Sequence, residues 1–410
     1  MKYKNVPAQL PPEIAEKLYG KNLYLSVSQL ESYYLDSYSH FLQYGLRLKE
    51  REKYELTAAG TGEFYHEALE NIVSLIREKT NLTVEELEGI TVSVLQLLFG
   101  SEKYAIFSSS NRMTFIKEQL QDTIQRMAWI IHGQRRLTTF ENIQTEAIFG
   151  QTGEPGTLKG MAFPLKKDRS LFIRGKIDRI DKINLNGQTY LSILDYKSSK
   201  HTFKFDDAYY GLAMQMITYL DVAMMNADQL SKNKVIPAGA FYLHVKHPYM
   251  KILEQPGREE WEETLIADNK IRGLIIADPE LTKAMEPAAQ DGMPHLVLPV
   301  RYTKNGGFYK NINEMVTPEE LDLLIKNNRR RIKEAGQTIL DGKLKMNPVK
   351  GRLFNPSVQG PYRAVSQFDS TLQENRYRRL EKMSKDDVLK TLQSELALPE
   401  EDDEGEEENK

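Results

Sequence analysis

The order of strand-like and helix-like segments between residues 140 and 245 constrains the fold of this chain more than any other feature. Four runs have the apolar and β-branched patterns of strands: ENIQTEAIFG, SLFIRGKIDRI, TYLSILDYK and IPAGAFYLHV. One helical run, DAYYGLAMQMITYLDVAMM, lies between the last two. A strand, a helix and a further strand in this order predict a crossover connection. We therefore expect an α/β fold, with a central mixed sheet flanked by helices.

Helices are expected on the N-terminal side of this sheet. The run LSVSQLESYYLDSYSHFLQYGL predicts one helix, because Ser28 and Glu31 have the spacing of a capping box and apolar or aromatic residues recur every three to four positions. Further amphipathic helices are predicted near 61–78, 84–99 and 110–134.

A long helix is predicted in VTPEELDLLIKNNRRRIKEAG, on the C-terminal side of the sheet. Thr317 is its expected N-cap and Pro318 its first helical residue. The helix carries a cationic run, Arg329, Arg330 and Arg331. Such a run is either a solvated helix face or a surface that contacts the phosphates of a nucleic acid, and the sequence leaves both open.

The domain organisation follows from these segments. We expect one domain over residues 1–398, with a helical part at about 26–135, a sheet core at about 140–250 and a C-terminal helical part at about 255–398. Residues 399–410 contain EEDDEGEEENK, with eight acids and one lysine, and are predicted to be a disordered acidic tail. The formal charge is −3 for the whole chain and −7 for this run, so the remaining body is mildly basic.

Composition excludes several classes of function. The chain has no cysteine, which rules out disulfides, thiolate metal sites and cysteine nucleophiles. No apolar run reaches the ~18–20 residues of a membrane span and no signal peptide is visible, so we expect a cytoplasmic protein without a membrane contact. No GxxxxGK[ST] motif occurs, so no ATP binding by this chain is expected.

The run SILDYKSS places an acid and a base at the end of an apolar strand. Side chains alternate along a strand, so Asp195 and Lys197 share one face while Tyr196 points to the other. Asp178 ends the preceding strand, across a hairpin expected to close near 184–187. Two carboxylates that converge in this way repel each other unless a hard divalent cation lies between them. The pattern therefore favours a metal site held by oxygen ligands.

The Asp-x-Lys triplet is weak evidence by itself, because this chain has the same spacing in DNK at 268–270 and DGK at 341–343. The alternative is a surface hairpin whose acids pair with Arg174, Arg179 or Lys182. From the two acids alone, the alternatives are balanced.

Two helical patterns add to the candidate site. In GTGEFYHEALE, His66 is four residues from Gly62 and from Glu70, so one helix face could present an imidazole to the metal, although such a histidine is more often structural. In GLAMQMITYL, Gln215 and Tyr219 also lie four residues apart, on the face of the crossover helix. Each pattern alone would suit an ordinary buried helix face.

Taken together and in this order, the four motifs resemble the RecB-type branch of the PD-(D/E)xK nucleases. The family pattern is a helical Gly-x-x-x-His, a Gly-x-x-Asp-Arg-Ile strand, Asp-Tyr-Lys and then Gln-x-x-x-Tyr. The matching segments here are GEFYH, GKIDRI, DYK and QMITY. The resemblance implies a PD-(D/E)xK nuclease core and phosphodiester hydrolysis of DNA that depends on Mg²⁺, with Mn²⁺ as a possible substitute.

The resemblance also implies a role for each matched residue. His66, Asp178, Asp195 and the carbonyl of Tyr196 would hold the metal. Lys197 would position the attacking water and offset charge on the phosphate. Gln215 would orient this lysine, and Tyr219 would line the path of the strand.

The similarity extends over nearly the whole chain, to the C-terminal nuclease portion of the AddB/RexB subunit of bacterial ATP-dependent helicase/deoxyribonucleases. It rests on segments such as YYGLAMQMITYLDVA, PAGAFYLHVKHP and NRYRRL. Because those subunits are longer, we expect this chain to be an excised C-terminal portion. By resemblance it is an exonuclease domain in double-strand-break repair and recombination that degrades the 5′-terminated strand. Its expected partners are single-stranded DNA delivered by a helicase and an AddA/RexA-type subunit. The alternatives are a non-catalytic scaffold for DNA or the partner, and a stand-alone nuclease.

One departure from the family concerns iron. Many AddB relatives hold an iron–sulfur cluster through four cysteines, and the corresponding positions here are Asp36, Ser357, Gly360 and Ser366. We therefore expect no cluster and a RexB-like branch. Apolar packing should fasten the two ends of the domain instead, between two sets of side chains: Tyr33, Tyr38 and Phe41 on one side, and Phe354, Tyr362, Val365 and Phe368 on the other.

Overall fold

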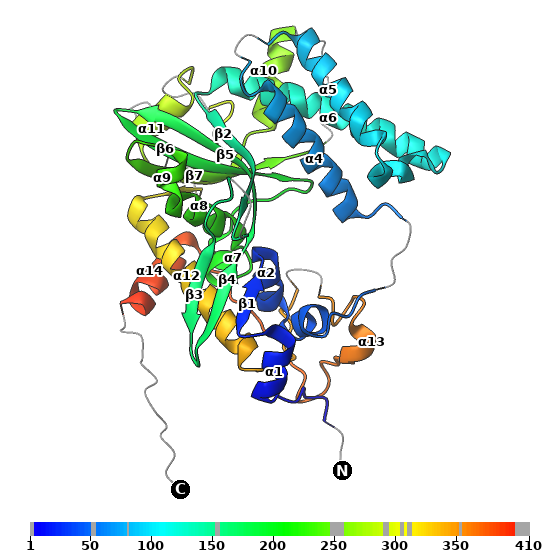
Figure 1. Ribbon diagram of the computed structural model, residues 1–410. Coiled ribbons are helices and arrows are strands. Elements are labelled where there is room, and N and C mark those ends of the chain that lie inside the picture. Colours follow the sequence, from blue (N-terminus) through cyan, green and yellow to red (C-terminus); the bar gives the residue numbers. More distant parts are fainter. Residues whose placement is uncertain are drawn as a thin grey trace.

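The computed structural model describes residues 4–50, 55–79, 82–151, 156–246, 258–289, 295–303, 307–309, 314–351 and 355–397. Its centre is a mixed six-stranded sheet in the order β2-β5-β6-β7-β8-β9 (Figure 1). The strands are β2 (Glu141–Phe149), β5 (Gly175–Leu185), β6 (Gln188–Lys197), β7 (Val235–His244), β8 (Arg272–Ile276) and β9 (Met315–Val316). The predicted α/β fold with a mixed sheet flanked by helices is confirmed.

Strands β5 and β6 form the predicted hairpin. They pair antiparallel, with Leu185 opposite Gln188, so the turn consists of Asn186 and Gly187. Both turn residues have positive φ, 51° and 74°, which matches the two-residue turns that suit the twist of a hairpin. Strand β6 then pairs in parallel with β7, which requires the predicted crossover.

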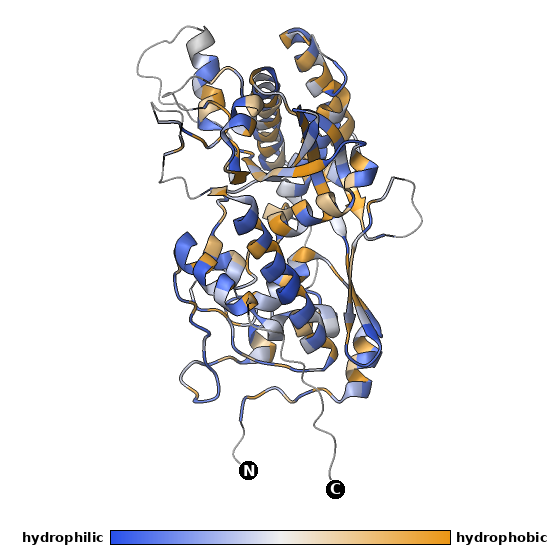
Figure 2. Ribbon diagram, turned by 90° about the vertical axis from the view of Figure 1, so that its left-hand side faces the viewer, coloured by the Kyte–Doolittle hydropathy of each residue, from blue (hydrophilic) through white to orange (hydrophobic). Residues whose placement is uncertain are grey.

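Helices cover both faces of this sheet. One layer contains α4 (Ala58–Ile76), α5 (Val84–Phe99), α6 (Asn111–Leu137) and α10 (Arg258–Asp268). The other contains α8 (Gln215–Met225), with α12 (Pro318–Leu340) and α14 (Lys385–Leu396) beyond it (Figure 1). The central strands and the helix sides that face them are largely hydrophobic (Figure 2). No helix among the described residues is long and apolar enough to cross a membrane.

The run SLFIRGKIDRI is two strands rather than the single strand predicted. β4 (Arg169–Ile173) belongs to a smaller sheet with β1 (Asn22–Leu25) and β3 (Met161–Leu165). Arg174 separates it from β5, and its N–H donates to the carbonyl of Leu25. A Cβ on Gly175 would lie 2.8 Å from the ring of Phe149, so only glycine fits where the chain changes sheet.

The helix predicted in LSVSQLESYYLDSYSHFLQYGL is interrupted. Helix α2 (Val27–Leu35) ends at Asp36, whose backbone is extended, and is followed by α3 (Ser37–His40) and the π-helical turn η1 (Phe41–Gly45). Asp36 caps α3 by accepting from the N–H of Ser39, which favours the break. The capping box of α2 is formed by Ser26 and Gln29, so the assignment to Ser28 and Glu31 was wrong.

The crossover helix is also divided. It consists of α7 (Phe205–Tyr209) and α8, joined by a turn in which Gly211 has a φ of 79°. The carboxylate of Glu31 accepts from the N–H groups of Met214 and Gln215, at 2.7 and 3.1 Å. Glu31 therefore binds the start of α8 instead of capping its own helix.

Three of the four positions that correspond to iron–sulfur ligands lie together. Asp36, Ser357 and Ser366 are buried. The Ser357 hydroxyl donates to Asp36, and the Ser366 hydroxyl donates to the carbonyl of Ser357. Gly360 lies in the same turn-rich segment, where its carbonyl accepts from the N–H of Arg363. Hydrogen bonds therefore join segments more than 300 residues apart in the sequence.

Apolar packing joins the same two segments, in part as predicted. Phe41 and Tyr362 are buried in one small cluster, with Tyr38 packed against it. Phe368 packs edge-on against Tyr377 instead, and Val365 is 53% exposed, so neither contributes as expected. Phe354 and the predicted acidic tail at 399–410 lie outside the described residues.

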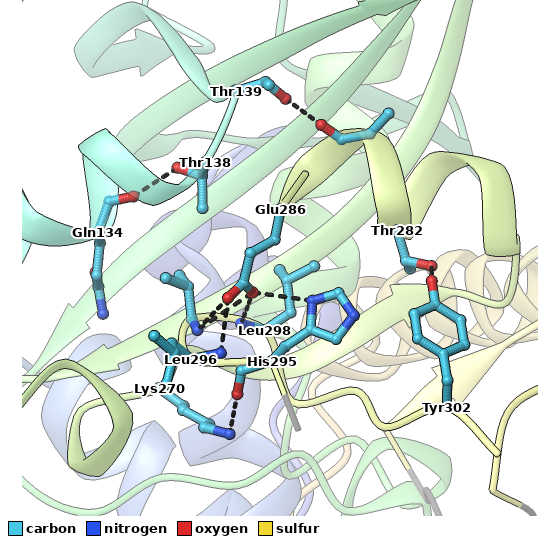
Figure 3. Close-up of polar contacts among 12 residues, drawn as sticks. Gln134, Thr138, Thr139, Lys270, Thr282, Glu286, His295, Leu296, Leu298 and Tyr302 are labelled. Atoms are coloured by element: carbon cyan, nitrogen blue, oxygen red, sulfur yellow. Dashed lines mark hydrogen bonds and ion pairs between the residues drawn. The ribbon is translucent and has the colours of Figure 1, made fainter. Parts of the chain in front are cut away.

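A separate buried network anchors the loop after α11 (Pro279–Met285). Glu286 accepts from His295 Nδ1 at 2.9 Å and from the N–H groups of three successive residues, Leu296, Val297 and Leu298 (Figure 3). Lys270 donates to the carbonyl of His295. Since this carboxylate is saturated by donors from its own loop, the network has the form of a structural anchor.

Candidate active site

Asp178 and Asp195 face each other across the β5–β6 hairpin. The strand register pairs Arg179 with Leu194 and Ile180 with Ile193, and its continuation places Asp178 opposite Asp195. Asp178 lies near the start of β5, so the prediction that it ends its strand was wrong. Directly opposed residues of an antiparallel pair project from the same face. Both aspartates are buried, so the two carboxylates predicted to converge do so.

Lys197 and Gln215 complete a triangle with Asp195. The ammonium of Lys197 lies 2.5 Å from Asp195 Oδ2 and donates to Gln215 Oε1 at 2.8 Å. The amide Nε2 of Gln215 donates to Asp195 Oδ1 at 2.8 Å. Each group contacts the other two, which fixes the rotamers of the lysine and the aspartate. Helix α8 supplies the glutamine as its first residue.

His66 approaches Asp178 from α4, in the opposite helical layer. Its Nδ1 lies 3.0 Å from Asp178 Oδ2, which also accepts from the N–H of Tyr196 at 2.9 Å. The Tyr196 side chain is buried and its ring lies edge-on to His66. The structure thus brings the histidine motif and the two strand motifs to one place.

The electrostatics of this cluster reflect its burial. Burial raises the pKa of Asp195 to about 6, and the nearby carboxylate of Asp178 adds to the rise while Lys197 opposes it. Burial would lower the pKa of His66, but the hydrogen bond to Asp178 and the charges of both aspartates raise it above its ordinary value. Two acids held this close accumulate negative charge that a cation would relieve.

Tyr219 and Glu31 support the cluster from behind. Tyr219 is buried, its ring packs edge-on against Phe149, and it hydrogen-bonds to Gln215. Glu31 holds the backbone of Gln215, as described above, and burial raises the pKa of Glu31 to about 7. Both residues therefore act on the lysine through the glutamine.

Glu146 is an acid near the site that was not predicted from the sequence. It lies in β2 between Thr145 and Ala147, which pair with Arg179 and Ile177, so it occupies the position opposite Asp178. Its φ of 49° is unusual for a residue within a strand, and its carboxylate forms an ion pair with Lys176. The only signal in the sequence was one acid in QTEAIF, which has no distinguishing spacing.

The cationic run of α12 is engaged within the protein. Arg329 donates through two nitrogens to the carboxylate of Asp221, both at 2.7 Å. Arg330 contacts Glu395 at 2.6 Å, and Arg331 contacts Glu334 at 3.3 Å. These partners account for the run without a nucleic acid, and its contact with phosphates stays a prediction.

The donor set suits a hard divalent cation. Asp178 and Asp195 offer carboxylate oxygens and Tyr196 offers a carbonyl, which are the ligand types of Mg²⁺ and Mn²⁺ sites. His66 adds an imidazole, a donor that suits softer transition metals better than Mg²⁺. Within the described ranges, no three histidine, aspartate or glutamate side chains already form a ligand cluster. Lys197 and His66 contact the aspartates and offset part of their negative charge.

Comparison with known proteins agrees with this geometry. Residues 24–352 match the PD-(D/E)XK nuclease superfamily. Three similar relatives are each named as the B subunit of an ATP-dependent helicase/deoxyribonuclease. That of Enterococcus faecalis is 37% identical over 95% of this chain and 33% of its own length. Those of Latilactobacillus sakei and Oceanobacillus iheyensis are 38% and 32% identical over 96% of this chain and 34% of their own lengths.

The chain spans about a third of the length of the curated relatives it matches. The matched range includes each residue of the cluster around Asp178 and Asp195. The similarity to AddB/RexB-type proteins expected from the sequence is confirmed. The family match over residues 24–352 shows that the chain belongs to the PD-(D/E)XK nuclease superfamily, and the opposed aspartates with their lysine agree with it.

Proposed function

We propose that this chain is a metal-dependent DNA exonuclease domain. The observation that carries the proposal is the contact of Lys197 and Gln215 with Asp195, directly opposite Asp178. Burying such a cluster costs free energy, because two acids and a base are removed from water together. Clusters of this kind are concentrated at functional sites. The names of the relatives support a deoxyribonucleic acid substrate.

In this proposal Asp178, Asp195, the Tyr196 carbonyl and His66 hold Mg²⁺, with Mn²⁺ as a substitute. When bound, the ion polarises the scissile phosphate and lowers the pKa of the attacking water. Lys197 holds this water by a hydrogen bond and offsets negative charge that develops on the phosphate.

The supporting residues keep the lysine in place. The Gln215 carbonyl accepts from Lys197 while its amide donates to Asp195, so one side chain sets the distance between base and acid. Tyr219 restrains Gln215 in turn. Such preorganisation is the main contribution a protein makes to hydrolysis of this kind, because the groups need not reorganise as charge develops.

The proposed setting follows the relatives' names. These names support a helicase/deoxyribonuclease complex as the setting and go no further. From the resemblance of the motifs we further propose that a helicase subunit of the AddA/RexA type delivers a single strand to this site in the cytoplasm during double-strand-break repair, and that the 5′-terminated strand is degraded.

The test is cleavage of single-stranded DNA labelled at either the 5′ or the 3′ end. Wild-type protein should cleave in Mg²⁺ or Mn²⁺ and not in EDTA, and the pattern of the two labels reports strand polarity. Asp178→Asn and Asp195→Asn should abolish cleavage while leaving the thermal melt intact. Asp268→Asn is the matched control, since it alters the exposed aspartate of another Asp-x-Lys triplet. Equal cleavage in EDTA, or full activity of Asp195→Asn, would refute the proposal.

A further inference from the structure

A large cavity lies beside the small sheet, between the N-terminal elements and the segment around Tyr362. Its volume is about 780 Å³. The elements α1 (Pro12–Tyr19), β1 and α2 lie together below the central sheet in Figure 1. Cations and aromatic rings both contribute to its wall. We call this cavity the β1 groove and define it by six lining residues: Tyr24, Tyr44, Arg47, Lys49, Glu50 and Arg174.

The charge of the β1 groove is positive. Arg47, Lys49 and Arg174 line it and are exposed, whereas Glu50 is the one acid among the described lining residues. In the described part of the chain, none of the three cations has a carboxylate within ion-pair distance. This differs from Arg329, which is held by Asp221. Exposed cations without an internal partner are available to bind phosphates.

The aromatic component is suited to stacking. Tyr24 lies in β1, is 47% exposed, and stacks on Phe172 with ring centroids 5.0 Å apart and an interplanar angle of 18°. Phe172 supports one face of this ring, which leaves a rigid platform. Tyr44 is a second, half-buried ring in the wall. Cations interspersed with aromatic rings characterise sites for single-stranded nucleic acids, whose bases are free to stack.

The β1 groove is connected to the catalytic cluster by the chain itself. Arg174 immediately precedes β5, and Asp178 follows four residues later, which is at most roughly 13 Å along a strand. The carbonyl of Leu25 accepts from the N–H of Arg174, so β1 is fixed to the same point. A strand bound in the groove would therefore reach the aspartates within a short distance.

We infer that the β1 groove binds the single-stranded part of the substrate next to the scissile phosphate, through phosphates on Arg47, Lys49 and Arg174 and a base on Tyr24. This inference rests on the proposed nuclease function, since it assigns that function's substrate a path. The two proposals can be tested separately, because the groove can bind DNA whether or not the site around Asp178 and Asp195 cleaves it.

The test is equilibrium binding of a fluorescein-labelled 20-nucleotide oligothymidylate in EDTA, followed by anisotropy over a range of salt concentrations. Replacing the three cations by alanine should reduce the slope of log affinity against log salt by about 2, because each phosphate contact contributes about 0.7 on a single strand. Tyr24→Ala should weaken binding roughly 5- to 150-fold for the single strand and leave duplex binding unchanged, because paired bases cannot stack on the ring.

Matched controls separate specific from general effects. Alanine at three exposed cations outside the groove removes the same charge and should leave the salt slope unchanged: Arg112, Lys382 and Lys390. Phe115→Ala removes an exposed aromatic ring from α6 and is the control for Tyr24. Arg174→Glu alone provides a second variant if the triple substitution does not fold.

The two proposals fail in different ways. Wild-type affinity and salt slope in the folded groove variants would overturn the groove and leave the nuclease proposal standing. Weakened binding in those variants, together with no metal-dependent cleavage by the wild type, would support the groove and refute the nuclease.

Discussion

The carboxylate of Glu31 accepts a hydrogen bond from the backbone N–H of Gln215 at 3.1 Å. It also accepts from Met214, so one side chain of α2 binds the first turn of α8. Gln215 in turn contacts both Lys197 and Asp195. The N-terminal part of the chain therefore helps to position the glutamine that contacts Lys197.

Glu31→Ala should reduce kcat with little change in KM, because it releases the start of α8 without touching the substrate. It should also destabilise the fold by about 0.5–2 kcal/mol, the usual cost of losing a helix cap. Glu31→Gln keeps an oxygen that accepts the same N–H groups and should restore most of the activity. Equal kcat for Glu31→Ala and wild type would show that Gln215 is positioned by other contacts.

Glu31→Gln should also flatten part of the pH dependence of stability. Burial raises the pKa of Glu31 to about 7, so the folded state binds a proton more tightly than the unfolded state. The contribution of Glu31 to the free energy of unfolding is therefore complete below about pH 4.5 and is lost as the pH rises through about 7. Urea unfolding across this interval measures the difference between variant and wild type.

Lys197→Met should lower kcat by about 10²–10³-fold, because it removes the cation that offsets charge on the phosphate while preserving side-chain length. The metal ligands remain, so metal binding measured by calorimetry should persist. Lys204→Met, at an exposed lysine paired with Asp207, is the matched control and should keep wild-type turnover. Turnover near the wild-type rate in Lys197→Met would exclude the proposed role of the lysine.

His40→Phe should remove a pH-dependent loss of stability. His40 is buried between Tyr33 and Tyr44, and burial lowers its pKa to about 4. The unfolded chain binds a proton at about 6.5, so the wild type loses about 3 kcal/mol as the pH falls from about 6.5 to 4. The variant should lack this loss in urea unfolding, whereas a substitution of the exposed His201 should retain it. Parallel pH profiles for His40→Phe and wild type would contradict the assignment.

Asp36→Ala should destabilise the domain by about 1–3 kcal/mol, because the hydroxyls of Ser39 and Ser357 lose their buried acceptor. The double variant with Ser357→Ala should cost less than the sum of the single changes, since no unpaired hydroxyl then remains at Ser357. A chelator should leave the melting temperature of metal-free protein unchanged. Additive effects would mean that the hydrogen bond across this junction contributes nothing.

Local patterns predicted the parts of the site that lie on single elements. Alternation along β6 placed Asp195 and Lys197 on one face, and the hairpin turn brought Asp178 opposite. These relations depend on neighbours within about 20 residues, so periodicity reveals them. The spacing of Gln215 and Tyr219 was likewise visible, but not the break of the helix just before Gln215.

Longer-range relations could not be predicted in this way. Glu31 is separated from Met214 by 183 residues. Nothing in the sequence of α2 shows whether this carboxylate caps α2 itself or the distant helix α8. Glu146 lies opposite Asp178 and has an unusual φ, and neither property can be inferred from composition. The division of SLFIRGKIDRI between two sheets could not be predicted, because both halves carry apolar residues at strand spacing and only one glycine lies between them.

The hydrogen bond between Ser357 and Asp36 has a consequence for biosynthesis. A ribosome exposes the chain from its N-terminus, and α2 lacks its partner segment until residues near 357 have emerged. Contacts so distant in sequence form late, because the intervening loop must close first. Until then α2, which carries Glu31, lacks one of the contacts that join it to the rest of the domain. In a growing chain, the N-terminal and C-terminal parts of this domain can therefore be joined only after most of its residues have been translated.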